Sequence, residues 1–86
     1  MCYKIKLYIG GHLVTITHRT DTLANVLSCA RKTATLLSEN PERVKICVID
    51  AEGNGIMTYV CGNKPKAMYT AIDHTNKERK TYYTGA

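Results

Sequence analysis

The most regular hydrophobic pattern in the chain is helical and runs from about Asp21 to Asn40. Its apolar residues recur at spacings of three and four, which places them on one stripe of a helix. They are Leu23, Val26, Leu27, Ala30, Ala34 and Leu37. Asp21 or Thr22 is suited to cap the first turn. Because Pro41 disfavours helical geometry at the residue before it, we expect the helix to end by Glu39 or Asn40.

Before this helix, hydrophobic and polar residues alternate from Tyr3 to Ile9, which is the pattern of a half-buried strand. Gly10 and Gly11 can adopt the positive φ angles of a two-residue hairpin turn. With this turn the apolar faces of the two strands coincide, which favours the register strongly. The predicted pairs are Ile9 with His12, Leu7 with Val14, and Ile5 with Ile16.

After the helix, the segment from Arg43 to Asp50 is rich in β-branched residues, and a second run extends from Ile56 to Cys61. The glycines of Gly53-Asn54-Gly55 predict a hairpin turn of two, three or four residues between them. A three-residue loop pairs Ile46 with Val60 and Val48 with Thr58, and it leaves Cys47, Ile49, Met57, Tyr59 and Cys61 on the other side. Both faces are then apolar, as in a strand pair that is covered twice or that meets a partner.

A third hairpin is the preferred interpretation of the C-terminal part of the chain. Its first strand begins near Met68, its turn lies at His74 to Lys77, and its second strand returns through Tyr83. This arrangement places Tyr69 near Tyr82. The alternative is a helix that starts after Pro65.

The predicted fold is a single α+β domain spanning residues 1–86, with an antiparallel sheet of four to six strands and one helix packed on one face. One helix covers one face of the sheet, which is expected to comprise Ile5, Leu7, Val14, Ile16, Ile46 and Val48. The opposite face is then expected to display Lys4, Lys6, Tyr8, Leu13, Arg19, Lys45, Ile49, Met57 and Tyr59.

The net charge of the chain favours some classes of binding partner over others. The formal net charge is +5, which favours nucleic acid or an acidic protein surface and argues against a mimic of DNA. The sequence has neither a signal peptide nor an apolar run long enough to cross a membrane, so we expect a cytoplasmic protein. Its four cysteines form no close pair and its three histidines are not placed to join them, so we expect free, buried thiols and no metal or cofactor.

Two functional interpretations of the uncovered face compete. In the first, Lys4, Lys6, Arg19 and Lys45 contact phosphates while Tyr8 and Tyr59 stack on the bases of a nucleic acid. In the second, Leu13, Ile49, Met57 and Tyr59 form the dry centre of a protein interface, either with a second copy of the chain or with a foreign target. A third interpretation is that further strands or loops cover this face.

Enzymatic activity is the less favoured interpretation. Cys2 and His18 could form a nucleophile pair across the first hairpin, but we expect them to project to opposite faces of the sheet. Asp50 and Glu52 lie beside a Gly-Asn turn, where acidic residues usually stabilise the turn itself. We therefore expect no catalytic residues and no small-molecule substrate.

In its size, its charge and its lack of catalytic motifs, the chain resembles the small proteins with which bacteriophages and mobile elements bind and block host machinery, including inhibitors of CRISPR complexes. The resemblance implies a non-enzymatic protein that occupies a surface of a nucleic acid or nucleoprotein complex, and it identifies no site. The alternative from another class is a self-associating structural or regulatory protein whose open sheet face closes a homodimer.

Overall fold

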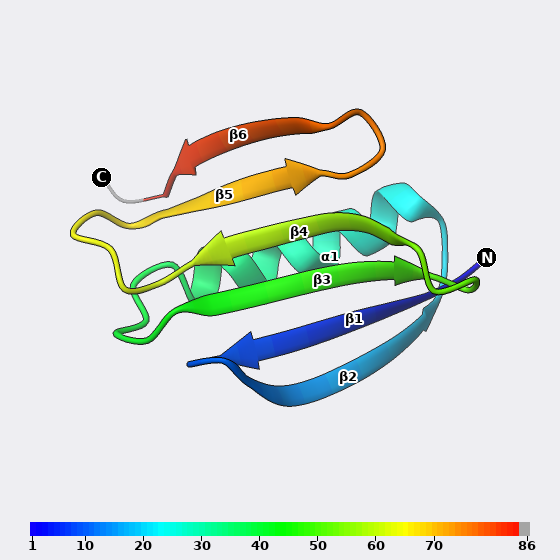
Figure 1. The fold of residues 1–86 in the computed structure, drawn as a ribbon, viewed down its shortest axis with the longest axis horizontal. Coiled ribbons are helices and arrows are strands. Elements are labelled where there is room, and N and C mark those ends of the chain that lie inside the picture. Colours follow the sequence, from blue (N-terminus) through cyan, green and yellow to red (C-terminus); the bar gives the residue numbers. More distant parts are fainter. Residues whose placement is uncertain (85–86) are drawn as a thin grey trace.

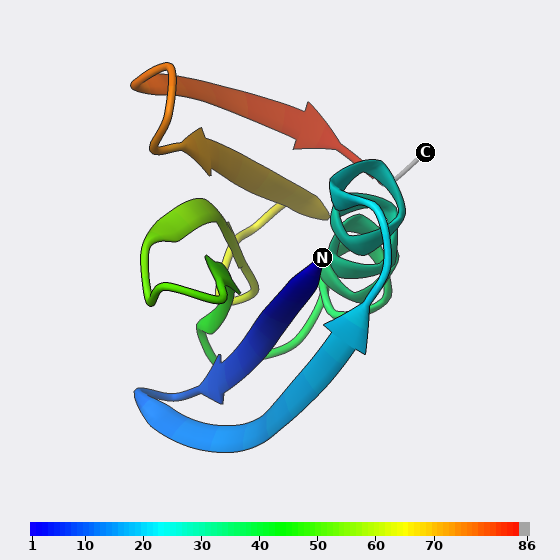
Figure 2. The same ribbon diagram turned by 90° about the vertical axis from the view of Figure 1, so that its right-hand side faces the viewer.

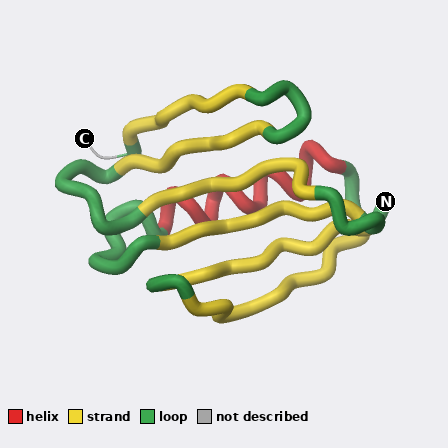
Figure 3. Tube along the Cα trace, viewed as in Figure 1, coloured by secondary structure: helices red, strands yellow, loops and turns green. Residues whose placement is uncertain are grey.

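The computed structural model describes residues 1–84 and shows one helix packed on a six-stranded antiparallel sheet (Figures 1 and 3). The elements are β1 (Cys2–Ile9), β2 (His12–Thr20), α1 (Leu23–Leu36), β3 (Val44–Asp50), β4 (Gly55–Cys61), β5 (Met68–Asp73) and β6 (Glu78–Tyr83). The strand order is β2-β1-β3-β4-β5-β6. The predicted α+β fold is thereby confirmed; residues 85–86 of the predicted domain lie outside the described residues.

The core lies between α1 and the middle of the sheet. Val26, Ala30 and Ala34 of the helix are fully buried, as is the β3 residue Ile46. Two alanines at the contact allow the helix axis to approach the sheet closely, because they add little side-chain volume. Figure 2 shows α1 against one face of the twisted sheet, while no other element of residues 1–84 packs on the opposite face. The predicted apolar stripe is therefore confirmed as the buried side of the helix.

The two ends of α1 differ in how well the sequence predicts them. Thr22 is the N-cap, and its hydroxyl accepts a hydrogen bond of 3.3 Å from the backbone N–H of Asn25. At the other end the helix stops at Leu36, before the predicted limit of Glu39 or Asn40, so it is shorter than the expected stretch to about Asn40. The Ser38 hydroxyl donates to the carbonyl of Thr35 at 2.8 Å, and this side-chain bond competes with continuation of the helical ladder.

The register predicted for the first hairpin is wrong beyond its first pairs. Ile9 pairs with His12 as predicted, but Leu7 pairs with Thr15 because a β-bulge inserts Val14 as an extra residue. Ile16 therefore pairs with Lys6 and faces away from α1. Val14 and Ile16, which were expected in the core, are 56% and 43% exposed.

The second hairpin is also displaced by one residue. Ile46 pairs with Tyr59 and Val48 with Met57, and the register shifts between Val48 and Ile49. This pairing turns Tyr59 and Met57 toward the helix, so of the three loop lengths considered, the three-residue loop that pairs Ile46 with Val60 is wrong. The Asp50 carboxylate accepts hydrogen bonds from the backbone N–H groups of Glu52 at 2.9 Å and Asn54 at 2.8 Å, as expected of a turn former. These bonds stabilise the ionised form and lower the pKa of Asp50.

The third hairpin is confirmed in place of the alternative helix. Tyr69 pairs with Tyr82, and their rings stack with centroids 5.2 Å apart. Tyr59 meets Tyr69 edge to face at 5.8 Å, so the three rings extend the core from β4 toward the edge of the sheet. The Asp73 carboxylate closes the turn by accepting the backbone N–H of Thr75 at 2.9 Å.

The glycine turns give a direct test of the packing. Gly62 has a φ of +77°, and a Cβ there would overlap the backbone carbonyl oxygen of Glu42 and lie 3.1 Å from that of Asn40. Gly53 has a similar φ of +87° but open space around it. We expect Gly62→Ala to lower the free energy of unfolding by about 3 kcal/mol, from backbone strain plus overpacking, and Gly53→Ala by about 1 kcal/mol from strain alone. Equal losses in urea melts of the two variants would contradict this packing.

Cys61 gives a test at alkaline pH. All four thiols are free, but only Cys61 is fully buried and Cys2 is exposed, so the expectation of four buried thiols is wrong. Burial raises the pKa of the Cys61 thiol from 9.0 to about 11. A pKa raised in the folded state contributes stability that is present below pH 9 and is lost as the pH rises toward 11.

We therefore expect the free energy of unfolding to fall by about 1 kcal/mol between pH 9 and pH 10 through Cys61. Urea melts at both pH values measure this loss. It should be absent in Cys61→Ala and unchanged in Cys2→Ala, in which the exposed thiol is removed. A loss of the same size in Cys61→Ala would show that other groups cause it; burial also raises the pKa of Tyr59 above 10.0, which is why the window ends at pH 10.

Candidate functional site

The candidate site is the sheet face that points away from α1, here called the open face. Side chains alternate between the two faces along each strand, so the pairing register assigns every strand residue to one of them. The open face comprises Cys2, Lys4, Lys6 and Tyr8 of β1, Leu13, Ile16, His18 and Thr20 of β2, Lys45, Cys47 and Ile49 of β3, Thr58 and Val60 of β4, Met68, Thr70 and Ile72 of β5, and Arg79, Thr81 and Tyr83 of β6.

The two faces of the sheet differ in charge. The open face carries four permanently basic side chains, Lys4, Lys6, Lys45 and Arg79, and no acidic residue among the strand positions of residues 1–84. The acidic residues of the strands, Asp50, Asp73 and Glu78, all lie on the helix side of the sheet. Two basic strand residues, Arg19 and Lys80, share that side with them. The open face is therefore the electropositive side of the sheet.

Cross-strand rows show how the basic and apolar side chains are mixed. One row contains Ile16, Lys6, Cys47, Thr58, Ile72 and Arg79, and the next contains Leu13, Tyr8, Lys45, Val60, Thr70 and Thr81. Within the second row the Lys45 ammonium lies 4.9 Å from the centroid of the Tyr8 ring, a cation–π contact. The face thus offers lysines for anions beside an aromatic ring and aliphatic groups for flat or apolar surfaces.

Six of the nine residues predicted on this face are located there. Lys4, Lys6, Tyr8, Leu13, Lys45 and Ile49 face away from α1. Arg19, Met57 and Tyr59 do not, so their predicted placement is wrong. Tyr59 is 1% exposed, Met57 packs against the core, and the Arg19 guanidinium lies on the helix side, where it contacts the Cys29 sulfur at 3.5 Å and the Asp21 carboxylate at 3.7 Å.

Other open-face residues were not predicted from the sequence. Ile16 and Val60 were assigned to the core side because the bulge and the register shift leave no distinctive pattern in the sequence. Arg79 could have been found, because the predicted pairing of Tyr69 with Tyr82 already fixes its facing.

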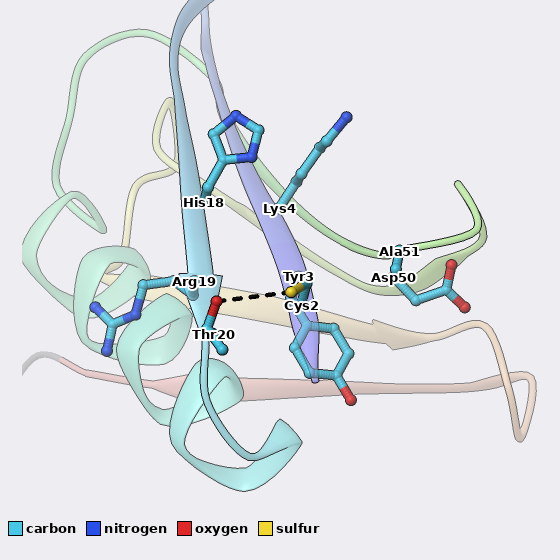
Figure 4. Close-up of a pocket in the computed structure, with 8 residues that line it drawn as sticks. All are labelled: Cys2, Tyr3, Lys4, His18, Arg19, Thr20, Asp50 and Ala51. Carbon is cyan, nitrogen blue, oxygen red and sulfur yellow. Dashed lines mark hydrogen bonds between the residues drawn. The ribbon is translucent and has the colours of Figure 1, made fainter.

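Cys2 and His18 lie on the same face of the sheet, so the expectation that they project to opposite faces is wrong. Cys2 pairs with Thr20, and His18 pairs with the intervening Lys4. Figure 4 shows Lys4 and His18 on one side of the strands and Arg19 directed toward the helix. The Cys2 sulfur lies 3.6 Å from the Thr20 hydroxyl, which is not a base that could activate it. A pocket of 260 Å³ opens here at the strand ends.

Two further observations concern other possible binding sites in residues 1–84. No group of three or more histidine, cysteine or acidic side chains among them is arranged to hold a metal ion. On the helix side, a hollow of 510 Å³ lies between the outer surface of α1 and Tyr69, and its lining includes Arg31, Lys32 and the exposed Leu36. This hollow is the main competitor of the open face as a binding surface.

Comparison with known proteins gives no family assignment: no family model, curated protein or solved structure matches the chain. Within the described residues, α1 has neither the length nor the apolar content that a membrane-spanning helix requires. The geometry of the open face is therefore the basis of the function proposed below.

Proposed function

We propose that the protein binds single-stranded nucleic acid on the open face and acts by occupying that strand or the nucleoprotein complex that contains it. The observation that carries the proposal is the charge segregation: Lys4, Lys6, Lys45 and Arg79 share a face that has no acidic strand residue. Neutralising phosphates with lysine and arginine releases counterions, which is the main source of affinity for nucleic acids.

A single strand fits this face better than a duplex. The sheet is a broad surface, roughly 24 Å across six strands, with no protruding helix to enter a groove. Unpaired bases can stack on Tyr8 and rest on Val60 and Ile72, while phosphates meet the lysines between them. Tyr59 is buried, and the open-face tyrosines of residues 1–84 are Tyr8 and, on the edge strand β6, the 67% exposed Tyr83. With so few aromatic rings, most of the affinity is assigned to phosphates and little to base identity.

On this proposal the mechanism is steric and electrostatic and needs no catalysis. A basic sheet that covers a single strand excludes other proteins from it, and the same contact inhibits a nucleoprotein complex whose working strand is exposed. Inhibition of host machinery such as a CRISPR complex, in the cytoplasm, is one form that this function would take.

Fluorescence anisotropy with labelled single-stranded DNA, single-stranded RNA and duplex DNA tests the proposal across a salt series. We expect the single strands to bind more tightly, with log affinity falling against log salt at a slope of about −2 to −3, because each phosphate contact to a single strand contributes about −0.7. Affinity that is independent of salt, or no binding to any of the three at low salt, would refute the proposal.

Self-association is the second candidate, favoured by a separate observation at the edge of the sheet. β2 is an edge strand, and its residues Leu13, Val14 and Ile16 are 49%, 56% and 43% exposed. No Lys, Arg, Asp or Glu interrupts it between His12 and His18. Charged residues usually protect exposed edges from pairing with another chain. This edge could therefore join that of a second copy, although the bulge at Val14 limits the regular stretch available.

Light scattering separates the two candidates. If self-association is the function, the wild-type protein is a dimer at micromolar concentration and Ile16→Lys is a monomer, because a lysine at this position opposes edge pairing. Leu36→Lys serves as the control, since it places the same charge at an exposed leucine on α1 and leaves β2 intact. A wild-type monomer, or a dimer that survives Ile16→Lys, would exclude this interface.

A further inference from the structure

A small basic pocket lies where the open face meets the turn between β1 and β2. It has a volume of 340 Å³ and is lined by Tyr8, Gly11, Arg43 and Lys45. Two of these four residues are cationic and none is acidic. The pocket therefore combines a concave shape with the charge that an anion requires.

The fold holds these residues together through backbone contacts. Tyr8 pairs with Lys45 across β1 and β3, and the N–H of Gly10 donates to the carbonyl of Arg43 at 2.8 Å. The turn is thereby fixed against the residue that precedes β3. Gly11, with a φ of +83°, leaves open space beside the pocket. The nearby carboxylate of Glu42 lies against Gly10 and is not part of the pocket lining.

We propose that this pocket is a phosphate subsite, in which Arg43 and Lys45 bind one phosphate group of the strand. The inference rests on the proposed function and specifies where one phosphate is held. Arg43 supplies a planar fork of donors suited to phosphate oxygens, and Lys45 supplies a point charge. The neighbouring Tyr8 ring favours a nucleotide phosphate over other anions, because the base attached to that phosphate can stack on the ring.

The contact between Lys45 and Tyr8 gives the subsite a specific mode of action. Without ligand, the ammonium lies over the ring at 4.9 Å and occupies the surface on which a base would stack. A phosphate in the pocket attracts Lys45 away from the ring, because a full negative charge competes with the weaker quadrupole of the ring. Phosphate binding and base stacking are therefore coupled through one side chain.

Two sources of phosphate share this chemistry: a terminal monoester, with a charge of about −1.5 to −2, and an internal diester, with a charge of −1. Three single-stranded decamers of one sequence distinguish them, carrying a 5′-phosphate, a 3′-phosphate or neither. The test variant is Arg43→Gln. The matched control is Lys64→Gln, which removes one charge from the exposed loop between β4 and β5. Thermal melts by circular dichroism establish that both variants are folded.

If the subsite takes a terminal phosphate, one phosphorylated decamer binds the wild type about tenfold more tightly than the unphosphorylated one, and Arg43→Gln abolishes that gain. If it takes an internal phosphate, Arg43→Gln weakens all three decamers about tenfold and makes the salt slope shallower by about 0.7. Either result supports the subsite. Affinities of Arg43→Gln equal to those of Lys64→Gln for all three decamers would overturn it.

A second measurement tests the coupling. Tyr8→Leu should weaken binding of a decamer with bases more than that of an abasic decamer of equal length, because only the former can stack. Equal weakening of both would refute the role of Tyr8. The subsite and the proposed function can fail separately. If only the subsite is wrong, the wild type still binds the decamers and Lys6→Glu weakens that binding. If the proposed function is wrong, the wild type binds no decamer.

Discussion

Replacing Lys4 and Lys6 together by glutamate is expected to weaken binding of single-stranded nucleic acid by on the order of 100-fold at 0.1 M salt. Both side chains lie on the open face of β1, the strand next to the edge strand β2. The double variant removes two phosphate contacts and replaces them with two repulsive charges. Anisotropy titrations across a salt series should also show a slope that is shallower by about 1.4, since two contacts to a single strand are lost.

The matched control is the double variant Lys64→Glu and Lys66→Glu. Both residues are exposed in the loop between β4 and β5, so the control changes the net charge by the same amount but leaves the open face unaltered. We expect it to weaken binding less than tenfold, through the overall field alone. Equal losses in the two double variants would mean that net charge, and not the open face, determines binding.

The second large effect concerns stability. We expect Tyr59→Ala to lower the free energy of unfolding by about 3–5 kcal/mol, because it removes a large buried ring and leaves a cavity beneath α1. The ring also contacts Tyr69 edge to face, and that contact would be lost. In a domain of 86 residues this loss is a large fraction of the total stability. Urea denaturation followed by circular dichroism measures it.

Tyr8→Ala provides the comparison, because Tyr8 is also a strand tyrosine but lies on the open face. Its loss should cost about 1 kcal/mol or less, chiefly from the contact with Lys45. If the two substitutions had equal effects on unfolding, the register of the second hairpin would not be the one observed here. The pair therefore tests which tyrosine is structural and which is available to a ligand.

The sequence predicts those parts of the fold that depend on local periodicity. The stripe of α1 is determined by a repeat of about 3.6 residues, which few other structures satisfy. Thr22 caps the helix through its own hydroxyl, and the third hairpin follows from its turn residues. The facings of β1 are also correct, because each of its buried residues alternates with a polar one or with Tyr8.

Registers between strands are less predictable, because a single extra residue changes the facing of everything beyond it. Val14 in β2 and the shift beside Ile49 are such irregularities. In β2 the apolar residues Val14 and Ile16 alternate with threonine, but Leu13 directly before them is also apolar, so either facing is compatible with the sequence. The helix covers β3 and β4 most closely and makes no comparable contact with β2, so no core contact fixes the facing of Ile16.

The candidate site was likewise predictable where the facing of a strand is determined by its own sequence, and not where it depends on the register between strands. Lys4, Lys6 and Tyr8 come from the strand whose facing the sequence determines, and Lys45 follows from its alternation with the buried Ile46. Tyr59 and Met57 were misplaced because β4 is apolar on both faces. The pocket of Tyr8, Gly11, Arg43 and Lys45 could not be derived from the sequence, because it requires the end of β1 and the start of β3 to be adjacent.

The central claim is that the open face is the ligand surface, and a map of amide chemical shifts during titration with a single-stranded decamer tests it most directly. We predict that saturable shifts will cluster at Lys6, Tyr8, Lys45 and Thr58, with residues of α1 little changed. Shifts centred on Arg31, Lys32 and Leu36 would place the ligand in the helix-side hollow and contradict the account, as would a spectrum that does not respond to the decamer.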